Sequence, residues 1–331
     1  MSVNYGFYYV AHKNIPYICS DPFNGSYFME SPTSNKPLVL SQSNIITTAR
    51  YELTKMEKNL LYLAMREMKP GDPPGKLYYV SMVELRNRTN EEVKYDRLRG
   101  ITKKMLSRVL EAVLPNGDLL QTGFFSSVQY ITGTGTLEIG IDPKLRPYYG
   151  YLKSHFTTFE LDLALTLSSI YGKRMYEIFS MYKNMENKTF RITVDELKRR
   201  LGLLDPTTGK EKHPLYADFK RSVLEKAKEI NTATDLAFKC REIKLGRKVV
   251  ELEFTVIYTP KTVEIDFNEQ DMVLFTRLTD KFLLRRDQAI AALQKHAHTE
   301  LSKLLYKVQL LYKDGKIKNI GSYTAEALGV K

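Results

Sequence analysis

Apolar residues recur along the chain with two periods, one helical and one strand-like, and the order of the resulting elements occurs twice. Spacings of three and four residues predict amphipathic helices, alternation predicts strands, and turn-forming residues separate them. The first set comprises a helix over 54–68, a strand over 77–80, a short helix over 81–85, a helix over 95–106 and a hairpin over 119–141. The second set comprises a helix over 168–181, a strand over 190–192, helices over 193–201 and 216–230, and paired strands over 236–242 and 249–257.

The two sets are related in sequence as well as in order. Val80–Arg86 aligns with Ile192–Lys198 at an offset of 112 positions, and Tyr95 and Leu98 correspond to Tyr216 and Phe219. Repetition over this length is typical of a duplicated domain, since the repeats of solenoids are much shorter. Helix, strand, helix, turn, helix and hairpin is the order of a winged helix, a helix-turn-helix with a β-hairpin wing.

The predicted fold class is therefore α+β, with two tandem winged-helix domains and a helical C-terminal extension. The predicted divisions are an N-terminal arm and linker at 1–37, a first winged-helix domain at 38–145, a second at 146–260 and the extension at 261–331. Within the extension, apolar spacing predicts one long helix over 283–311 and a final short turn after residues 321–323.

The net charge of +12 is concentrated in one part of the chain. Residues 144–260 carry 22 Lys and Arg against 15 Asp and Glu, which is more than half of the excess. A concentrated positive charge indicates a polyanionic partner, because clustered Lys and Arg displace counterions from a phosphate backbone. Two cysteines far apart exclude a disulfide scaffold or a Cys-rich zinc module. Since no apolar run approaches about 18 residues and no signal peptide is recognised, we expect a cytoplasmic protein without membrane contact.

The predicted nucleic-acid contacts follow from the winged-helix order, in which the last helix enters the major groove. Bidentate Arg contacts to guanine are the commonest specific readout, so Lys220 and Arg221 are the main candidates. The residues expected to face DNA from the helix over 216–230 are Ala217, Asp218, Lys220, Arg221 and Glu225. The wing is expected to reach backbone phosphate through Lys244, Arg247 and Lys248.

Further basic residues are assigned weaker or supporting roles. The supporting candidates in the second domain are Lys173, Arg174, Lys198, Arg199 and Arg200. The helix over 95–106 of the nearly neutral first domain carries Arg97, Arg99, Lys103 and Lys104. The first domain is accordingly expected to bind DNA more weakly or to provide a dimer surface.

Several segments resemble the iteron-binding plasmid replication initiators, whose core is two tandem winged helices. The resemblance lies in Ser43–Ile46 with Ala49–Thr54, in Leu167–Glu177, in Phe219–Leu224 with the following Ala227 and Glu229–Asn231, and in Gly246–Lys248 with Leu252–Phe254. It spans roughly residues 38–258, and the second half is the more specific. The resemblance implies binding to repeated origin sequences, opening of an adjacent AT-rich region, and recruitment of the host initiator and replicative helicase. It also implies that monomers act at the origin and that dimers repress the initiator's own promoter.

Enzymatic alternatives receive little support from the residues, and we expect no catalytic residue, metal or cofactor. His296-Ala297-His298 has the letters of a rolling-circle nickase metal motif, but it falls in a helical pattern, where positions i and i+2 do not face each other. The segment Gly71–Lys76 is one spacer residue too short for a Walker A loop. The serious competitor is a transcriptional regulator with the same fold, since fold alone does not separate the two functions. Tandem direct repeats beside an AT-rich stretch would favour an initiator, and a lone inverted repeat would favour a regulator.

Overall fold

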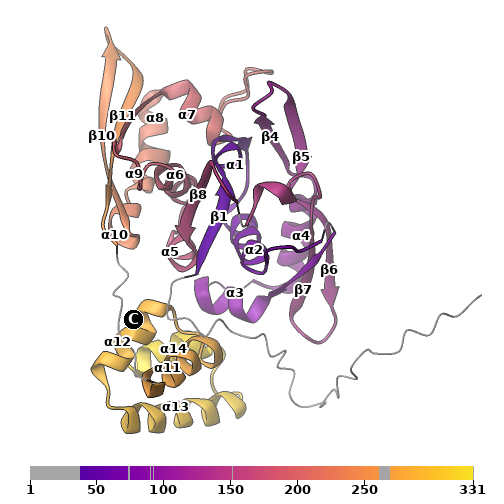
Figure 1. Cartoon of the computed structure of the whole chain (residues 1–331), viewed down its shortest axis with the longest axis vertical. Helices are drawn as coiled ribbons and strands as arrows, with labels where there is room; N and C mark the ends of the chain where they lie inside the picture. The colour runs from indigo at the N-terminus through magenta and orange to yellow at the C-terminus, as the bar shows by residue number, and fades with distance from the viewer. Residues whose placement is uncertain are drawn as a thin grey trace, which may run out of the picture. The chain divides into compact units, whose positions relative to one another are not determined.

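The protein is described by a computed structural model that covers residues 38–73, 75–89, 91, 93–150, 152–260 and 269–330 (Figure 1). The predicted arm and linker at 1–37 and the first eight residues of the predicted extension lie outside the described residues.

The first winged helix has the predicted order of elements. Its capping box is formed as expected, since the Thr54 side chain accepts from Glu57 N–H and Glu57 accepts from Thr54 N–H. The elements are α2 (Lys55–Arg66), β3 (Leu77–Ser81), α3 (Met82–Thr89), α4 (Tyr95–Leu106), β6 (Phe125–Ile131) and β7 (Thr136–Ile141). Strands β3, β7 and β6 form one antiparallel sheet, so the β6–β7 hairpin is the wing.

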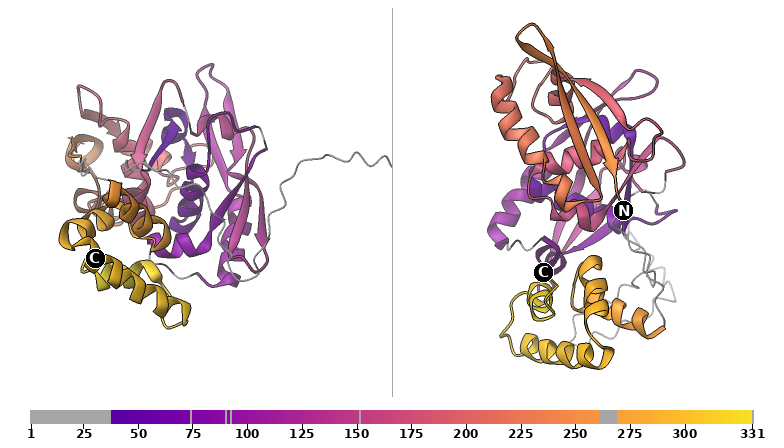
Figure 2. Two further views of the ribbon diagram at one scale, coloured as in Figure 1. Left: turned by 60° about the horizontal axis from the view of Figure 1, so that its bottom comes forward. Right: turned by 90° about the vertical axis from the view of Figure 1, so that its left-hand side faces the viewer.

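The second winged helix has the same order of elements, which Figure 1 labels and Figure 2 shows from two further sides. Its elements are α6 (Ile170–Ser180), β9 (Thr189–Thr193), α7 (Val194–Arg200), α8 (Tyr216–Phe219), a π-helical turn (Lys220–Leu224), α9 (Glu225–Ala227), α10 (Ile230–Ala233), β10 (Leu236–Leu245) and β11 (Lys248–Tyr258). Strand β9 pairs with β11, which pairs with β10. The predicted duplication is confirmed by the register, because the aligned residues Val80 and Ile192 pair with the corresponding wing residues Leu137 and Leu252.

Several short elements were not predicted. Strand β1 (Val39–Ser43) pairs along its whole length with β8 (Phe156–Glu160), across the predicted division at residue 145. The prediction of one hairpin over 119–141 is wrong in its first part, because Leu119–Gly123 forms β5, which pairs with β4 (Val109–Val113) in a separate hairpin before the first wing. Strand β4 also pairs with β2 (Arg50–Tyr51). The connecting helices are α1 (Asn44–Thr48), α5 (Leu161–Thr166) and a 3₁₀ turn (Arg146–Tyr148). One continuous apolar core extends through both winged helices, so they are packed as a unit.

The described part of the C-terminal extension forms a helical unit with an apolar core of its own. Its elements are α11 (Glu269–Thr276), a π-helical turn (Arg277–Lys281), α12 (Arg286–Lys295), α13 (His298–Lys313) and α14 (Ile320–Ala327). The prediction of a single long helix over 283–311 is wrong. The helix is interrupted because Ala297 adopts an extended conformation and begins a new helix, while the apolar spacing continues across the break.

Candidate nucleic-acid interface

The recognition helix of the second module begins after Leu215 and follows a continuous helical path through α8, the π-helical turn and α9. Phe219, Val223 and Ala227 are buried and attach the helix to the core, as the apolar pattern predicted. The helix therefore has one fixed inner face, and its other face is open to solvent.

The π-helical turn lies at the centre of this recognition helix. The backbone N–H of Glu225 donates to the carbonyl of Lys220, five residues earlier, instead of four. Such single-turn bulges occur often at functional sites, because they rotate the side chains that follow relative to a regular helix. Lys220 and Arg221 are the first two residues of this turn.

The predicted contact residues of this helix lie at its surface. Ala217, Lys220, Arg221 and Glu225 are exposed, and Asp218 is partly exposed. Arg221 is the most open, with 80% of its side chain accessible, and it forms an ion pair with Asp218 at 2.7 Å on the preceding turn. A surface pair of this kind contributes at most about 1 kcal/mol, so the guanidinium can exchange Asp218 for a base edge or phosphate at little cost.

Glu242 of β10, which the sequence analysis missed, connects the recognition helix to the wing. Its carboxylate accepts hydrogen bonds from Lys220 at 2.8 Å and from the Tyr216 hydroxyl at 2.9 Å. The hydrogen bond from Lys220 holds the pKa of Glu242 below its usual value. Glu242 is 22 positions away from Lys220 in the sequence. Only the three-dimensional contact between β10 and the recognition helix identifies it.

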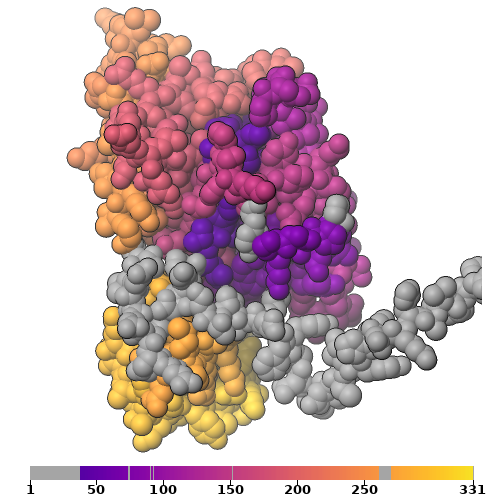
Figure 3. Space-filling model, in the orientation of Figure 1, coloured from indigo at the N-terminus to yellow at the C-terminus, as the bar shows by residue number. Residues whose placement is uncertain are grey.

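The wing of the second module presents its basic residues at the tip. Strands β10 and β11 are joined by a tight turn in which Gly246 has a positive φ of 61°. Lys244, Arg247 and Lys248 surround this turn and are exposed, and the hairpin tip protrudes at the upper edge of the surface in Figure 3. The predicted wing residues are therefore brought together in space, and their contact with DNA stays a prediction.

The solvent-facing side of the wing sheet carries a second basic group that was not predicted. Arg241 and Arg191 flank Glu253 in adjacent strands and donate to it at 2.8 and 2.7 Å. Both arginine side chains are more than half exposed, whereas that of Glu253 is 17% exposed. Two guanidinium groups that share one carboxylate carry a net positive charge.

The corresponding helix of the first module, α4, also presents its predicted residues to solvent. Leu98, Thr102 and Met105 are buried, and the opposite face carries the four exposed residues Arg97, Arg99, Lys103 and Lys104. No ion pair involves these four side chains within the part of the chain that the structure describes. Both modules thus expose a basic recognition helix.

The prediction that Lys173, Arg174 and Lys198 support DNA binding is wrong, because all three side chains are buried. Lys173 donates to backbone carbonyls at the end of α5, and burial lowers its pKa to about 7. Lys198 is bonded to Glu211 and to the carbonyl of His213 at 2.9 Å. Lysine and arginine are rarely fully buried unless they are paired, and these three have such partners.

The side chains of Arg199 and Arg200 are neither buried nor fully exposed. Both bind the carboxylate of Glu196 at 2.6 Å, and Arg199 also donates to the carbonyl of Thr48 in α1. Their side chains are 30% and 19% exposed. They link α7 to the rest of the protein, and their predicted contact with DNA remains untested.

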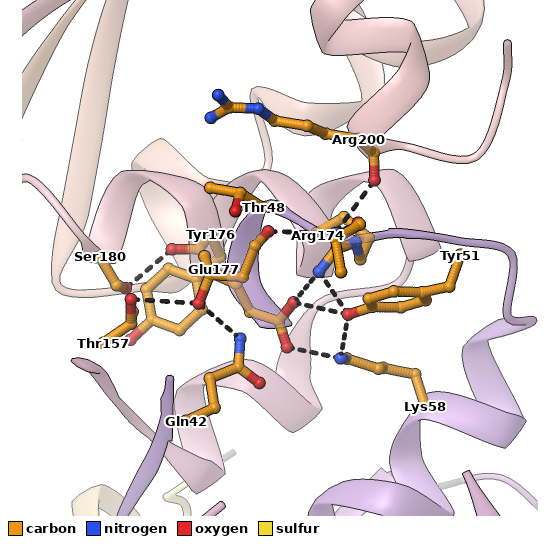
Figure 4. Close-up of polar contacts among 12 residues, drawn as sticks. Gln42, Thr48, Tyr51, Lys58, Thr157, Arg174, Tyr176, Glu177, Ser180 and Arg200 are labelled. Atoms are coloured by element: carbon orange, nitrogen blue, oxygen red, sulfur yellow. Dashed lines mark hydrogen bonds and ion pairs between the residues drawn. The ribbon is translucent and has the colours of Figure 1, made fainter. Parts of the chain in front are cut away.

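Arg174 and Glu177 of α6 form a buried polar cluster with α2 and β2 of the first module (Figure 4). Glu177 lies 2.7 Å from Lys58 and 2.6 Å from Arg174, and it also accepts from the Tyr62 hydroxyl at 2.9 Å. Burial alone would raise the pKa of Glu177, but the two cations outweigh it and hold the pKa below its usual value.

Arg174 extends this cluster to the backbone of both modules. Its second terminal nitrogen donates to the carbonyls of Thr47 and Ala49, each at 3.2 Å, and to that of Arg200 at 3.0 Å. One guanidinium therefore joins the segment before α2 to the end of α7 in the second helix-turn-helix. The cluster therefore connects the two modules through several hydrogen bonds.

The two histidines of the nickase-like motif have local partners. His296 bonds to the carbonyl of Leu328 at 3.0 Å, and His298 lies 2.6 Å from Asp271. The helical pattern in the sequence placed the motif inside a helix. In the structure, it lies at the break between α12 and α13. No group of three or more His, Cys, Asp or Glu suited to a metal is found among the described residues. The helices of the described ranges also include none long and apolar enough to cross a membrane.

Two winged helices, each with an exposed basic recognition helix and a wing, define a protein of the tandem winged-helix DNA-binding class. Family comparison assigns the chain more specifically. Residues 39–180 match the family model of the initiator replication protein WH1 domain, and residues 193–256 match that of the initiator Rep protein WH2 domain. The chain belongs to the replication initiator protein family, and its resemblance to that family is confirmed.

One solved structure agrees with this fold. The crystal structure of Pi initiator protein in complex with iteron DNA matches with a TM-score of 0.56 and 24% identity, over 69% of this chain and all of that one. The WH1 domain of MSBI1.176, a replication protein isolated from a multiple sclerosis patient, matches with 23% identity and a TM-score of 0.25, over 29% of this chain and 79% of that one.

Proposed function

We propose that the protein initiates plasmid replication by binding repeated origin sequences, the iterons, through both winged helices. The observation that carries this proposal is the duplication of an exposed basic recognition helix and wing within a member of the initiator family. The Pi initiator, which has the same fold, was crystallised with iteron DNA.

The two modules are proposed to contribute unequally. The second is assigned the main base readout, through Arg221 and Lys220, with phosphate contacts from the wing residues Lys244, Arg247 and Lys248. The first, carrying four exposed basic residues on α4, is assigned auxiliary contacts and self-association. Opening of an AT-rich region, recruitment of the host initiator and helicase, and autorepression by dimers belong to the same proposal and rest on family membership.

The proposed role requires no catalysis by this chain, no metal and no cofactor. Binding and bending of DNA by the modules, followed by recruitment of other proteins, is sufficient for initiation. The proposed location is the cytoplasm, where plasmid DNA is replicated.

A replicon assay tests the proposal directly. The gene and its flanking DNA are placed on a vector without another functional origin, and maintenance is compared between the intact gene and Arg221→Ala. Footprinting of the full-length protein on the same flanking DNA locates its sites. Maintenance that depends on the intact gene, together with protection of tandem direct repeats, is the expected result.

The alternative function, a transcriptional regulator, gives a different result in the same assay. A regulator would protect a lone inverted repeat and would not maintain the plasmid. That outcome would overturn the initiator proposal while leaving the DNA-binding interface intact.

A further inference from the structure

The C-terminal helical unit carries a basic and aromatic face that the two winged helices do not use. On α13, one side packs into the unit's core through Leu301, Leu305 and Val308. The opposite side, at spacings of three and four residues, consists of Lys303, Tyr306, Lys307, Leu310 and Lys313, all exposed. We refer to these five residues as the α13 face; the helix lies along the outer edge of the unit in Figures 1 and 2.

The charge of the α13 face indicates an anionic partner. Its three lysines form no ion pair within the described part of the chain. The two acidic residues nearest in sequence lie at the ends of the helix and have their own neighbours. Glu300 is 3.7 Å from His296, and Asp314 is 3.3 Å from Lys316. Residues 303–318 carry five lysines and one acid, so the positive charge continues beyond the helix.

The apolar members of the face distinguish between kinds of anion. Tyr306 is 60% exposed and Leu310 is 44% exposed, and both lie between the lysines. Bases in a duplex are stacked on each other, whereas unpaired bases present faces that aromatic side chains can cover. A lysine-rich groove or surface with an aromatic platform is the usual design of single-strand binding.

The residue types on α13 differ from those on the recognition helices. The α13 face has no arginine, asparagine or glutamine, the side chains that read base edges with paired hydrogen bonds. Lysine acts on phosphate as a point charge and carries no sequence information. Binding through this face is therefore independent of sequence.

We propose that the α13 face binds single-stranded DNA, with Tyr306 stacking on a base and Lys303, Lys307 and Lys313 contacting the backbone. This proposal goes beyond the proposed function, because it assigns a ligand to a part of the chain outside both winged helices. It does not depend on iteron recognition, although an opened origin would provide such a strand.

The test measures binding of the full-length protein to a fluorescent oligothymidylate of about 20 nucleotides by anisotropy. The Lys303→Glu, Lys307→Glu, Lys313→Glu triple variant is compared with wild type over a range of salt concentrations. Loss of three phosphate contacts should reduce the slope of log affinity against log salt by about 2, at about 0.7 per phosphate for single strands. Tyr306→Ala should weaken binding about 5-fold to about 150-fold, the range for one stacked base, and Tyr306→Phe should retain the wild-type affinity.

The control for net charge is Lys76→Glu, Lys144→Glu, Lys153→Glu, three exposed lysines outside the C-terminal unit. Lys76 immediately precedes β3 and Lys144 follows β7, so both lie near the end of the β3–β7 ladder that is remote from the first wing tip. This variant should bind the oligothymidylate nearly as wild type does. Equal weakening in both triple variants would overturn the proposal, as would unchanged binding of Tyr306→Ala or no measurable binding by wild type.

A second measurement separates this proposal from iteron binding. Affinity for duplex DNA containing the footprinted repeats should be unchanged in the Tyr306→Ala variant. If single-strand binding is lost and duplex binding retained, the α13 face is a separate site. If Tyr306→Ala weakens duplex binding by the same factor, the face belongs to a general DNA surface and the proposal is wrong.

Discussion

Removing the carboxylate of Glu177 should destabilise the protein more than any other single loss of charge in the described structure. Glu177→Gln keeps the size of the side chain but leaves Lys58 and Arg174 buried without their anion. The side chains of Lys58 and Glu177 are fully buried, and that of Arg174 is 2% exposed. Neither cation can move to solvent without separating α2 from α6.

The magnitude follows from the fate of those cations. Breaking a buried ion pair by removing one partner typically costs about 3–5 kcal/mol. The whole free energy of unfolding of a natural domain is about 5–15 kcal/mol. The variant should therefore lose a large fraction of its stability. Lys58→Met in the Glu177→Gln background should recover part of it, because the uncompensated charge is then removed.

Urea denaturation followed by far-ultraviolet circular dichroism measures the loss. The chain has no tryptophan, and its 22 tyrosines provide a second signal by fluorescence. Glu253→Gln is the matched control, since Glu253 also bridges two arginines, but at the protein surface. Exposed pairs contribute about 0–1 kcal/mol, so the control should unfold almost as wild type does.

Two results would refute this reasoning. A loss below about 1 kcal/mol in Glu177→Gln, the level of an exposed pair, would mean that the buried cations find other partners or water. A Lys58→Met, Glu177→Gln variant as unstable as the sum of the single variants would mean that the two residues do not interact.

Three further predictions concern the DNA interface and buried lysine. Arg221→Ala should lose about 1–3 kcal/mol of discrimination between repeat and random duplexes; equal weakening on both, measured by competition titration, would show a phosphate contact only. Lys248→Ala should reduce the salt slope of duplex binding by about one unit, with Lys144→Ala as the unchanged control. Burial lowers the pKa of Lys173 to about 7, so the folded protein binds fewer protons than the unfolded chain above that pH. The free energy of unfolding should then rise between about pH 7 and 8 by up to about 1.4 kcal/mol per unit, and Lys173→Met should remove most of this rise in urea titrations at each pH.

The main helices and wing strands could be predicted because their signals are local. The capping box at Thr54 and Glu57 begins α2 where expected, and the repeat from Val80 to Ile192 falls at the same register in both sheets. Strands β1 and β8 could not be predicted in this way. Each strand is five residues long and pairs with the other, which lies more than a hundred positions away in the sequence. The local sequence of either strand therefore does not indicate its partner.

The predicted exposure of the site residues was correct for many side chains and wrong for several buried ones. Exposed residues such as Arg221 and Lys248 were found because the apolar stripe of a helix and the turn of a hairpin determine which neighbours face solvent. Lys173 and Lys198 were misplaced because the apolar stripe of a single helix does not show what packs on its other sides. Their partners are backbone carbonyls and a glutamate supplied by other elements.

The buried cluster at Glu177 links the two modules by directional hydrogen bonds. Apolar residues of similar volume often replace a buried ion pair with no loss of stability, so such a cluster is weak evidence for stabilisation. Hydrogen bonds differ from apolar contacts in having direction, and the bonds from Arg174 end on carbonyls of residues 47, 49 and 200. Any rotation of one module about the other would break several of them together. The cluster therefore resists rotation of one module about the other.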